Sequence, residues 1–169
     1  MTMKKRIKTA GALTLAAITV LSAAGLSSVY GALGVETDKK CSLTFTLDGT
    51  EFDELRSLDI PVDVYKVADI TEEAVYDTAK YTDFADLGLE KVSSTTTAEE
   101  WAQMAEDAMK IVEDKKIAPT ADVKVTKPAG ATESTGVIND LDTGMYLVQA
   151  EIVQTNEYTY DFTPYLVSL

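Results

Sequence analysis

The sequence predicts a mostly β fold, an Ig-like antiparallel β-sandwich with one inserted amphipathic helix. Residues 42–47 alternate between polar and apolar side chains, which is the period of a half-buried strand. Residues 98–114 instead repeat apolar side chains every three or four positions, as an amphipathic helix does. Further short runs of β-branched and aromatic residues, separated by turn residues, continue along the chain. Many short strands and a single helix are typical of a sandwich.

The N-terminal segment has the three-part layout of a secretory signal peptide. Basic residues at positions 4–8 precede an apolar run from Ala10 to about Leu26, and small or polar residues follow. We expect residues 1–31 to form this signal peptide, with cleavage after Gly31. The apolar run is shorter than the ~20 residues that a membrane-spanning helix needs, so we favour cleavage over an uncleaved membrane anchor. Contact with the membrane is then limited to the time before cleavage.

The chain is acidic, with 15 Lys and Arg residues against 28 Asp and Glu residues. The predicted signal peptide holds four of the basic residues and none of the acidic ones, which leaves 11 − 28 = −17 charges after cleavage. Nucleic acid is excluded as a partner, because phosphate binding needs clustered Lys and Arg. An acidic exported chain suits secretion or display at the cell surface.

The chain contains no His and a single Cys, Cys41. One Cys cannot form an internal disulfide, and without His the chain lacks Ser-His-Asp and Cys-His catalytic arrangements. The usual zinc sites are excluded for the same reason. We therefore expect no enzyme activity, no cofactor and no metal. Whether Cys41 is an idle or a dimerising thiol stays open at this point.

The predicted sandwich domain spans residues 42–169 and follows a polar, flexible lead-in at residues 32–41. A second strand is expected at Pro61–Ala68, which is rich in β-branched residues and begins with Pro, where a missing N–H is tolerated. Residues 69–91 are acidic and irregular. We expect three aromatic side chains to anchor this segment on the core: Tyr76, Tyr81 and Phe84.

The helix prediction at residues 98–114 rests on its N-terminus as well as on its apolar stripe. Thr97 and Glu100 match a capping box, and acidic residues in the first turn suit the helix dipole. The stripe includes the only Trp, Trp101. Such a stripe can bind a partner, but it usually packs on the domain's own sheet, so we interpret Trp101 as a core anchor.

The last third of the chain is predicted to hold most of the strands. We expect residues 145–154 to form a long strand that pairs with residues 157–162 as a hairpin. Shorter strands are expected at residues 121–126, 135–139 and 164–169.

The sequence Asp142-Thr143-Gly144 matches the three-residue core of aspartic protease sites. Those sites need two such loops whose carboxylates share a proton, so a single copy would require a homodimer. A calcium loop starting at Asn139 would need a Glu six residues after the Gly, where this chain has Ala150. We interpret the segment as a solvated turn between strands, in which Asp142 bonds its own backbone and Gly144 adopts unusual dihedral angles.

Three segments resemble a known family: residues 62–69 (VDVYKVAD), 141–148 (LDTGMYLV) and 160–169 (YDFTPYLVSL). They resemble the N-terminal domain of pilin-like, sortase-anchored surface proteins of Gram-positive bacteria, which contain collagen-adhesin B-type domains. The resemblance implies the Ig-like form of the sandwich and a place in the cell wall. The domain would then be the first of a longer or truncated surface protein, with other pilus subunits as partners.

The same resemblance raises the question of lysine crosslinks. Many domains of the family carry an internal Lys–Asn isopeptide bond, with the Lys in the first strand and the Asn in the last. Residues 42–47 contain no Lys and residues 165–169 contain no Asn, so we expect no such bond here. Lys66 resembles the lysine through which pilins polymerise, although the Pro that precedes that lysine is missing. The alternative is an exposed strand lysine beside the core.

Three functions follow as hypotheses. The first is an exported, non-enzymatic cell-surface module with a structural or adhesive role. The second is a free secreted domain that binds carbohydrate or a host protein on its loops. The third, a carboxylate-dependent hydrolase, would need two carboxylates facing each other across a cleft, and nothing in the spacing of the acidic residues pairs them.

Overall fold

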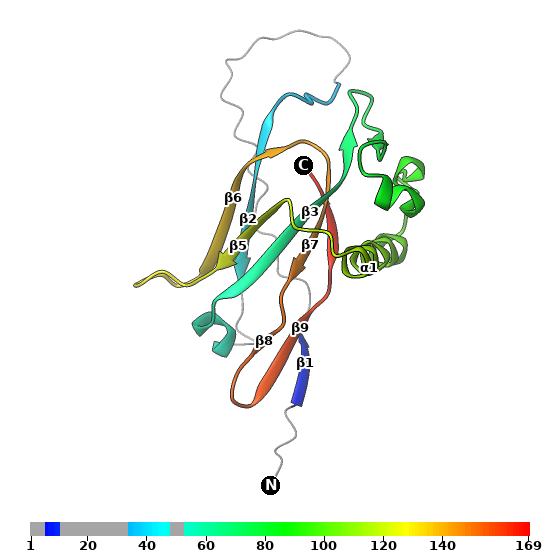
Figure 1. The fold of residues 1–169 in the computed structure, drawn as a ribbon. Coiled ribbons are helices and arrows are strands. Elements are labelled where there is room, and N and C mark those ends of the chain that lie inside the picture. Colours follow the sequence, from blue (N-terminus) through cyan, green and yellow to red (C-terminus); the bar gives the residue numbers. More distant parts are fainter. Residues whose placement is uncertain (1–5, 11–33, 48–52) are drawn as a thin grey trace.

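The computed structural model describes residues 6–10, 34–47 and 53–169. These residues form three β-sheets, one α-helix and three short 3-10 helices. Mainly antiparallel sheets that pack as in a sandwich, with one helix at their side, agree with the predicted mostly β fold (Figure 1). Within the described ranges, no helix is long and apolar enough to cross a membrane.

The central sheet is built around β3, the longest described strand. β3 (Ile60–Ile70) pairs with β7 (Met145–Ala150), and β10 (Tyr165–Ser168) continues the sheet beyond β7. β5 (Ala121–Val125) and the short β4 (Tyr76–Asp77) also pair with β3, and every one of these pairings is antiparallel. The predicted strand at Pro61–Ala68 is thus confirmed and lies in the middle of the sheet.

A second, two-stranded sheet packs on one face of the central sheet. It consists of β2 (Lys40–Leu47) and β6 (Ser134–Asp142), which run antiparallel. The predicted alternation is confirmed, because Leu43, Phe45 and Leu47 are buried. They meet Val62, Val64 and other apolar residues of the central sheet in one core. A single bridge between Thr126 and Thr135 links the two sheets at their edges.

Helical segments cover the opposite face of the central sheet. The helix α1 (Ala98–Lys115) begins at the predicted capping box, where the Thr97 hydroxyl accepts from the Glu100 N–H at 3.2 Å. Ala105, Ala108 and Val112 of α1 pack with Tyr65, Val67 and Leu147 of the sheet in a second core. Trp101, Tyr76, Tyr81 and Phe84 join this second core, with Phe84 fully buried and the others in part.

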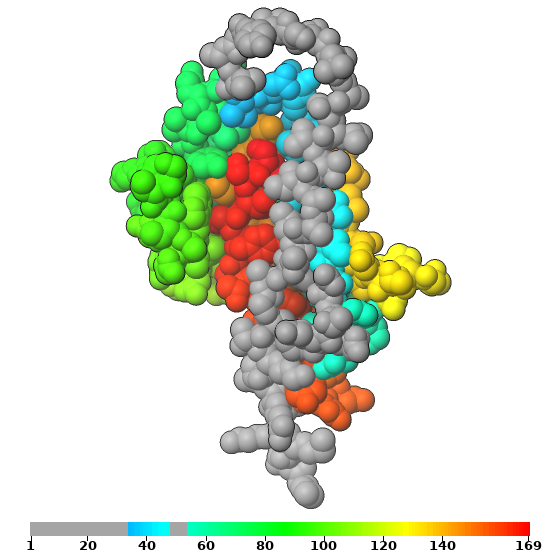
Figure 2. Space-filling model, turned by 180° about the vertical axis from the view of Figure 1, so that it is seen from behind, coloured from blue at the N-terminus to red at the C-terminus, as the bar shows by residue number. Residues whose placement is uncertain are grey.

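Two of the 3-10 helices, η2 (Thr82–Leu87) and η3 (Leu89–Lys91), connect the central sheet to α1. Seen from behind, these segments and α1 (green) lie beside β10 (red), while the loop near residue 130 (yellow) projects on the other side (Figure 2). The third, η1 (Asp53–Ser57), precedes β3. The β-rich core therefore has three layers: the β2–β6 sheet, the central sheet and the helical segments.

A third sheet consists of β8 (Val153–Gln154), β9 (Tyr158–Phe162) and β1 (Arg6–Ala10). β1 runs parallel to β9 and lies within the predicted signal peptide; most of that predicted peptide lies outside the described residues. Tyr160 and Phe162 of β9 are buried in the core shared with β2 and β6.

The predicted hairpin between residues 145–154 and 157–162 is wrong for most of its length. The predicted long strand is broken after Ala150 into β7 and β8, and β9 pairs only with the two residues of β8. The reason is that β3 and β10 already occupy both edges of β7, so no edge remains for β9. At the break, the Glu151 N–H donates to the Pro61 carbonyl at 2.9 Å.

The first strand and the lead-in also differ from their predicted bounds. β2 begins at Lys40, two residues before the predicted start of the domain. The described part of the lead-in, residues 34–39, contacts the domain: the Val35 N–H donates to the Glu72 carbonyl at 3.0 Å, and the Thr143 hydroxyl donates to the Thr37 carbonyl at 3.1 Å.

We predict that Gly144→Ala lowers the free energy of unfolding by at least about 2 kcal/mol. Gly144 has a φ of +149°, and a Cβ added there would lie 2.4 Å from the Ala68 carbonyl oxygen and 2.7 Å from the Lys66 Cε. Urea denaturation followed by circular dichroism measures the change.

The matched control is Gly130→Ala, since Gly130 also has a positive φ, +83°, but nothing lies within 4 Å of its added Cβ. We expect the control to lose about 1 kcal/mol from backbone strain alone. Equal losses in the two variants would contradict the close packing of Gly144 on β3.

Candidate functional site

The candidate site is centred on Lys66, the residue that the sequence singled out. Lys66 lies on β3 beside a shift of register against β7, between Lys66 and Ala68. The pairing of β3 with β5 ends at Val64, and Thr120 continues the hydrogen bonding along β3. The Thr120 N–H donates to the Val64 carbonyl at 2.8 Å, and the Thr120 hydroxyl accepts from the Lys66 N–H at 2.8 Å. The local backbone is therefore fixed on both sides of Lys66.

The Lys66 side chain is enclosed rather than exposed. Only 9% of it is accessible, and its Nζ lies 5.9 Å from the ring centres of both Tyr81 and Tyr146. The electron-rich ring faces attract a cation at this distance. The alternative prediction of an exposed strand lysine is therefore wrong about the exposure, although Lys66 does lie beside the core.

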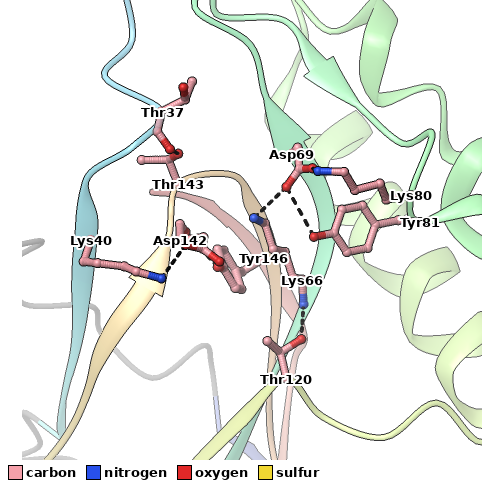
Figure 3. A network of polar contacts seen from close by, with 10 residues as sticks. All are labelled: Thr37, Lys40, Lys66, Asp69, Lys80, Tyr81, Thr120, Asp142, Thr143 and Tyr146. Carbon is pink, nitrogen blue, oxygen red and sulfur yellow. Dashed lines mark hydrogen bonds and ion pairs between the residues drawn. The ribbon is translucent and has the colours of Figure 1, made fainter.

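Asp69 is the counter-ion that makes this burial tolerable. The Lys66 Nζ lies 2.6 Å from Asp69 Oδ1, and the Lys80 Nζ lies 2.8 Å from Asp69 Oδ2 (Figure 3). The Tyr81 hydroxyl donates to the same carboxylate at 3.3 Å. One carboxylate therefore binds two ammonium groups and a phenol, which come from β3 and from the segment that precedes η2.

The electrostatics of the site keep Asp69 ionised. Burial by itself raises the pKa of the Asp69 carboxyl, but hydrogen bonds from Lys66 and Lys80 outweigh burial and hold the pKa below its ordinary value. Burial, followed by the charge of Asp69, raises the pKa of Tyr81 to about 12. Burial, followed by the charge of Asp142, also raises the pKa of Tyr146. The tyrosines are therefore neutral hydrogen-bond donors at neutral pH.

A second ion pair lies across the same end of the sandwich. The Lys40 Nζ of β2 lies 2.6 Å from the Asp142 Oδ1 of β6, and both side chains are more than half exposed. The first strand therefore does contain a lysine, Lys40, because it starts two residues before the predicted strand at residues 42–47. The lysine faces a carboxylate at the end of β6, and not an Asn of the last strand. The absence of an internal isopeptide bond stays a prediction.

The segment Asp142-Thr143-Gly144 forms the predicted turn, between β6 and β7. The Tyr146 hydroxyl donates to the Asp142 carbonyl at 2.7 Å, which holds the turn against the core. The Asp142 carboxylate pairs with Lys40, and the hydrogen bond from this lysine, with its charge, keeps the pKa of Asp142 low. This pairing fits a structural turn better than one half of a protease dyad, in which a second carboxylate would face the first.

Cys41 follows Lys40 on β2 and is only 4% exposed. Burial, with a smaller contribution from the charge of Asp142, raises the pKa of its thiol. A buried thiol with a raised pKa is poorly reactive, which favours the idle thiol over the dimerising one.

A polar cavity of about 340 Å³ is bordered by the Lys66–Asp69 ion pair and by Asp142 of the second pair. Its lining comes from the lead-in, β3, the segment before η2 and the turn between β6 and β7: Thr37, Lys66, Asp69, Ile70, Lys80, Asp142 and Thr143. Across the described part of the chain, no three His, Cys, Asp or Glu side chains are grouped so as to hold a metal ion. The cavity therefore offers ammonium and carboxylate groups that neutralise each other, from segments far apart in the sequence.

A larger groove, of about 650 Å³, lies beside α1, and we call it the acidic groove. Its lining includes five carboxylates, those of Asp63, Glu106, Glu113, Glu151 and Asp161. All but Asp63 are exposed, and Asp63 accepts a hydrogen bond from the Tyr65 hydroxyl at 3.2 Å. Sequence reasoning missed this groove because its carboxylates come from three separate stretches of the chain with no common spacing.

Comparison of the chain with models of protein families, with curated proteins and with solved structures gives no match. The interpretation of the site therefore rests on its geometry.

We predict that Asp69→Asn lowers the free energy of unfolding by about 1–3 kcal/mol, because it leaves the Lys66 ammonium enclosed without its counter-ion. Chemical denaturation at pH 7 measures the loss. Asp107→Asn is the matched control, since Asp107 pairs with Lys110 at 2.9 Å on the open surface of α1. The control should change stability little.

The double variant Lys66→Met/Asp69→Leu tests whether charge or packing matters at this position. Replacing a buried pair by apolar residues is often neutral, so most of the stability lost in Asp69→Asn should return. A double variant as unstable as the single one would contradict the role of the unpaired charge.

The pH dependence of stability should carry the signature of Asp69. Its pKa is lowered in the folded state from the ordinary value of 3.8, so its contribution is present above that pH and is lost as the pH falls below it. We expect the difference in unfolding free energy between wild type and Asp69→Asn to shrink as the pH is lowered from 5 towards 2. Denaturation curves across this range measure it, and a constant difference would contradict the expectation.

Proposed function

We propose that the chain is an exported, non-enzymatic module of a Gram-positive cell surface, pilin-like, with a structural or adhesive role. The observation that carries the proposal is the arrangement around Lys66. Charged side chains from several segments are paired with one another, so they serve to hold the domain together. A rigid domain of this kind suits a mechanical task such as spacing a binding tip from the cell wall.

The layered packing supports the same proposal. The central sheet is covered on both faces, and Asp83 of η2 pairs with Lys115 of α1 at 2.7 Å, which ties the helical layer together. A domain with one Cys has no internal disulfide, so its resistance to deformation has to come from its core. The predicted signal peptide and the acidic composition support export.

We further propose Lys66 as the residue through which neighbouring subunits are linked. Its neutral Nζ would attack the acyl carbon of a thioester that carries the acyl group of another subunit, so that the amide C–N bond forms as the C–S bond breaks and the thiol leaves. Lys66 lines the polar cavity, so an acyl group would reach the Nζ through this cavity. Asp69, at 2.6 Å, is placed to accept a proton from the ammonium group before it reacts. Formation of the amide would remove the positive charge of Lys66, and Asp69 would then pair with Lys80 alone.

The second candidate, a free secreted binding domain, is favoured by the acidic groove. Its volume suits a short segment of a carbohydrate or a protein loop, and Ile152, which is 57% exposed, gives it an apolar surface. The hydrolase is the weakest candidate, since four of the five carboxylates of the groove are exposed to solvent.

The test is fractionation of the native host into cytoplasm, membrane, cell wall and medium, followed by detection with an antibody against this chain. We predict that the chain is found in the cell-wall fraction as a ladder of high-mass species that resist boiling in detergent. Lys66→Arg should abolish the ladder while keeping the charge beside Asp69. Lys110→Arg, on the surface of α1, is the control and should keep the ladder.

Different outcomes separate the candidates. A single species in the medium would support the free binding domain, and a wall-bound ladder that survives Lys66→Arg would reject Lys66 as the linkage residue. A cytoplasmic chain with its first 31 residues intact would reject the proposal as a whole.

A further inference from the structure

We propose that the outer edge of β9 is an acceptor site for an extended, basic segment that adds to the sheet in parallel. Arg6–Ala10 occupies this edge as β1 while the N-terminal segment is attached (Figure 1). Removal of that segment at export frees the edge for an extended segment of a partner protein. This last step rests on the proposed function, because it needs the signal peptide to be cleaved.

The pairing of β1 with β9 shows what the edge accepts. Five consecutive residues are in register, from Arg6 opposite Tyr158 to Ala10 opposite Phe162. Among the described strands, β9 is the only partner of β1, and β8 takes the other edge of β9 for two residues. Among the described strands, β1 alone lies along the outer edge of β9, and such an edge is a ready template for another strand when β1 leaves it.

The connectivity makes β1 replaceable by a separate chain. A parallel pair cannot be closed by a tight turn, and here β1 and β9 are separated in the sequence by residues 11–157. β9 itself is anchored independently of β1, because Tyr160 and Phe162 belong to the core with β2 and β6. The acceptor is therefore held by the domain, whereas the strand that fills it is held at the edge by its pairing with β9.

Charge indicates which kind of segment fits. Asp161 of β9 and the neighbouring Glu157 are exposed, and the acidic groove includes Asp161 with four further carboxylates. The strand that occupies the edge has the sequence Arg-Ile-Lys-Thr-Ala, with two basic residues in five. An acidic second copy of the domain would be repelled, so the partner segment should be basic and extended.

The experiment uses the full chain and a fluorescein-labelled peptide of residues 1–12. In the variant Lys8→Pro/Thr9→Pro, β1 can no longer pair fully with β9. The N–H groups of alternate residues in a strand point to the same neighbouring strand, so two consecutive prolines always remove one N–H group that would face β9. Fluorescence anisotropy should show that the peptide binds this variant at least tenfold more tightly than the wild type, whose edge is occupied. Lys4→Pro/Lys5→Pro, outside β1, is the matched control and should behave as the wild type.

A peptide of the same composition in scrambled order, and the 1–12 peptide carrying both prolines, should bind at least tenfold more weakly. Far-UV circular dichroism checks that the variant keeps its fold. If the variant is unfolded, the folded wild-type chain with a protease site inserted after Gly31 gives the same measurement: cleavage should open the edge and raise peptide affinity to the same degree.

Three results would overturn the proposal: no binding to the opened chain by either route, equal binding of the scrambled peptide, or self-association of the opened chain that the peptide does not inhibit. The last would assign the edge to a second copy. None of these results depends on the location of the chain in the cell, so the failure of this proposal is distinguishable from the failure of the proposed function.

Discussion

The structure depends on β3, a strand that is hydrogen-bonded along both edges and buried on both faces. Val62 and Val64 point into the core shared with β2 and β6, and Tyr65 and Val67 point into the core covered by α1. A strand in this position needs apolar side chains on both faces, and β3 supplies them except at its charged residues Asp63, Lys66 and Asp69. Each of the other layers is placed against β3 or its neighbour β7, so a change there is felt on both sides of the domain.

Lys66 is the one basic residue of this strand, and it defines the candidate site. An ammonium group in such a position costs stability unless it is paired, and Asp69 meets this requirement three residues along the same strand. The register shift beside Lys66 and the absence of a side chain at Gly144 provide the space, since any Cβ at Gly144 would collide with the lysine stem. The lysine, the aspartate and the glycine therefore form one unit, in which packing and electrostatics cannot be separated.

The pairing of the strands explains why β9 has an edge outside the central sheet. β7 has both edges filled by β3 and β10, which forces β9 into a separate small sheet. β9 consequently keeps an edge that the domain's own later strands do not cover, and a distant segment of the chain supplies the missing partner. The acidic groove lies beside the same strand, because Asp161 and Phe162 line it. Strand pairing and charge thus act on one surface.

Local patterns in the sequence determined the elements: the alternation in β2, the β-branched run of β3, the stripe and capping box of α1 and the turn at Asp142-Thr143-Gly144. Each depends on residues within about ten positions, which is the range over which periodicity and capping operate. Only the tertiary structure decided which strands pair, because an edge of β7 taken by β10 cannot be read from either strand alone. It also decided that Lys66 is enclosed and bound to Asp69, and that five scattered carboxylates line one groove, since burial and charge pairing depend on neighbours that are distant in the sequence.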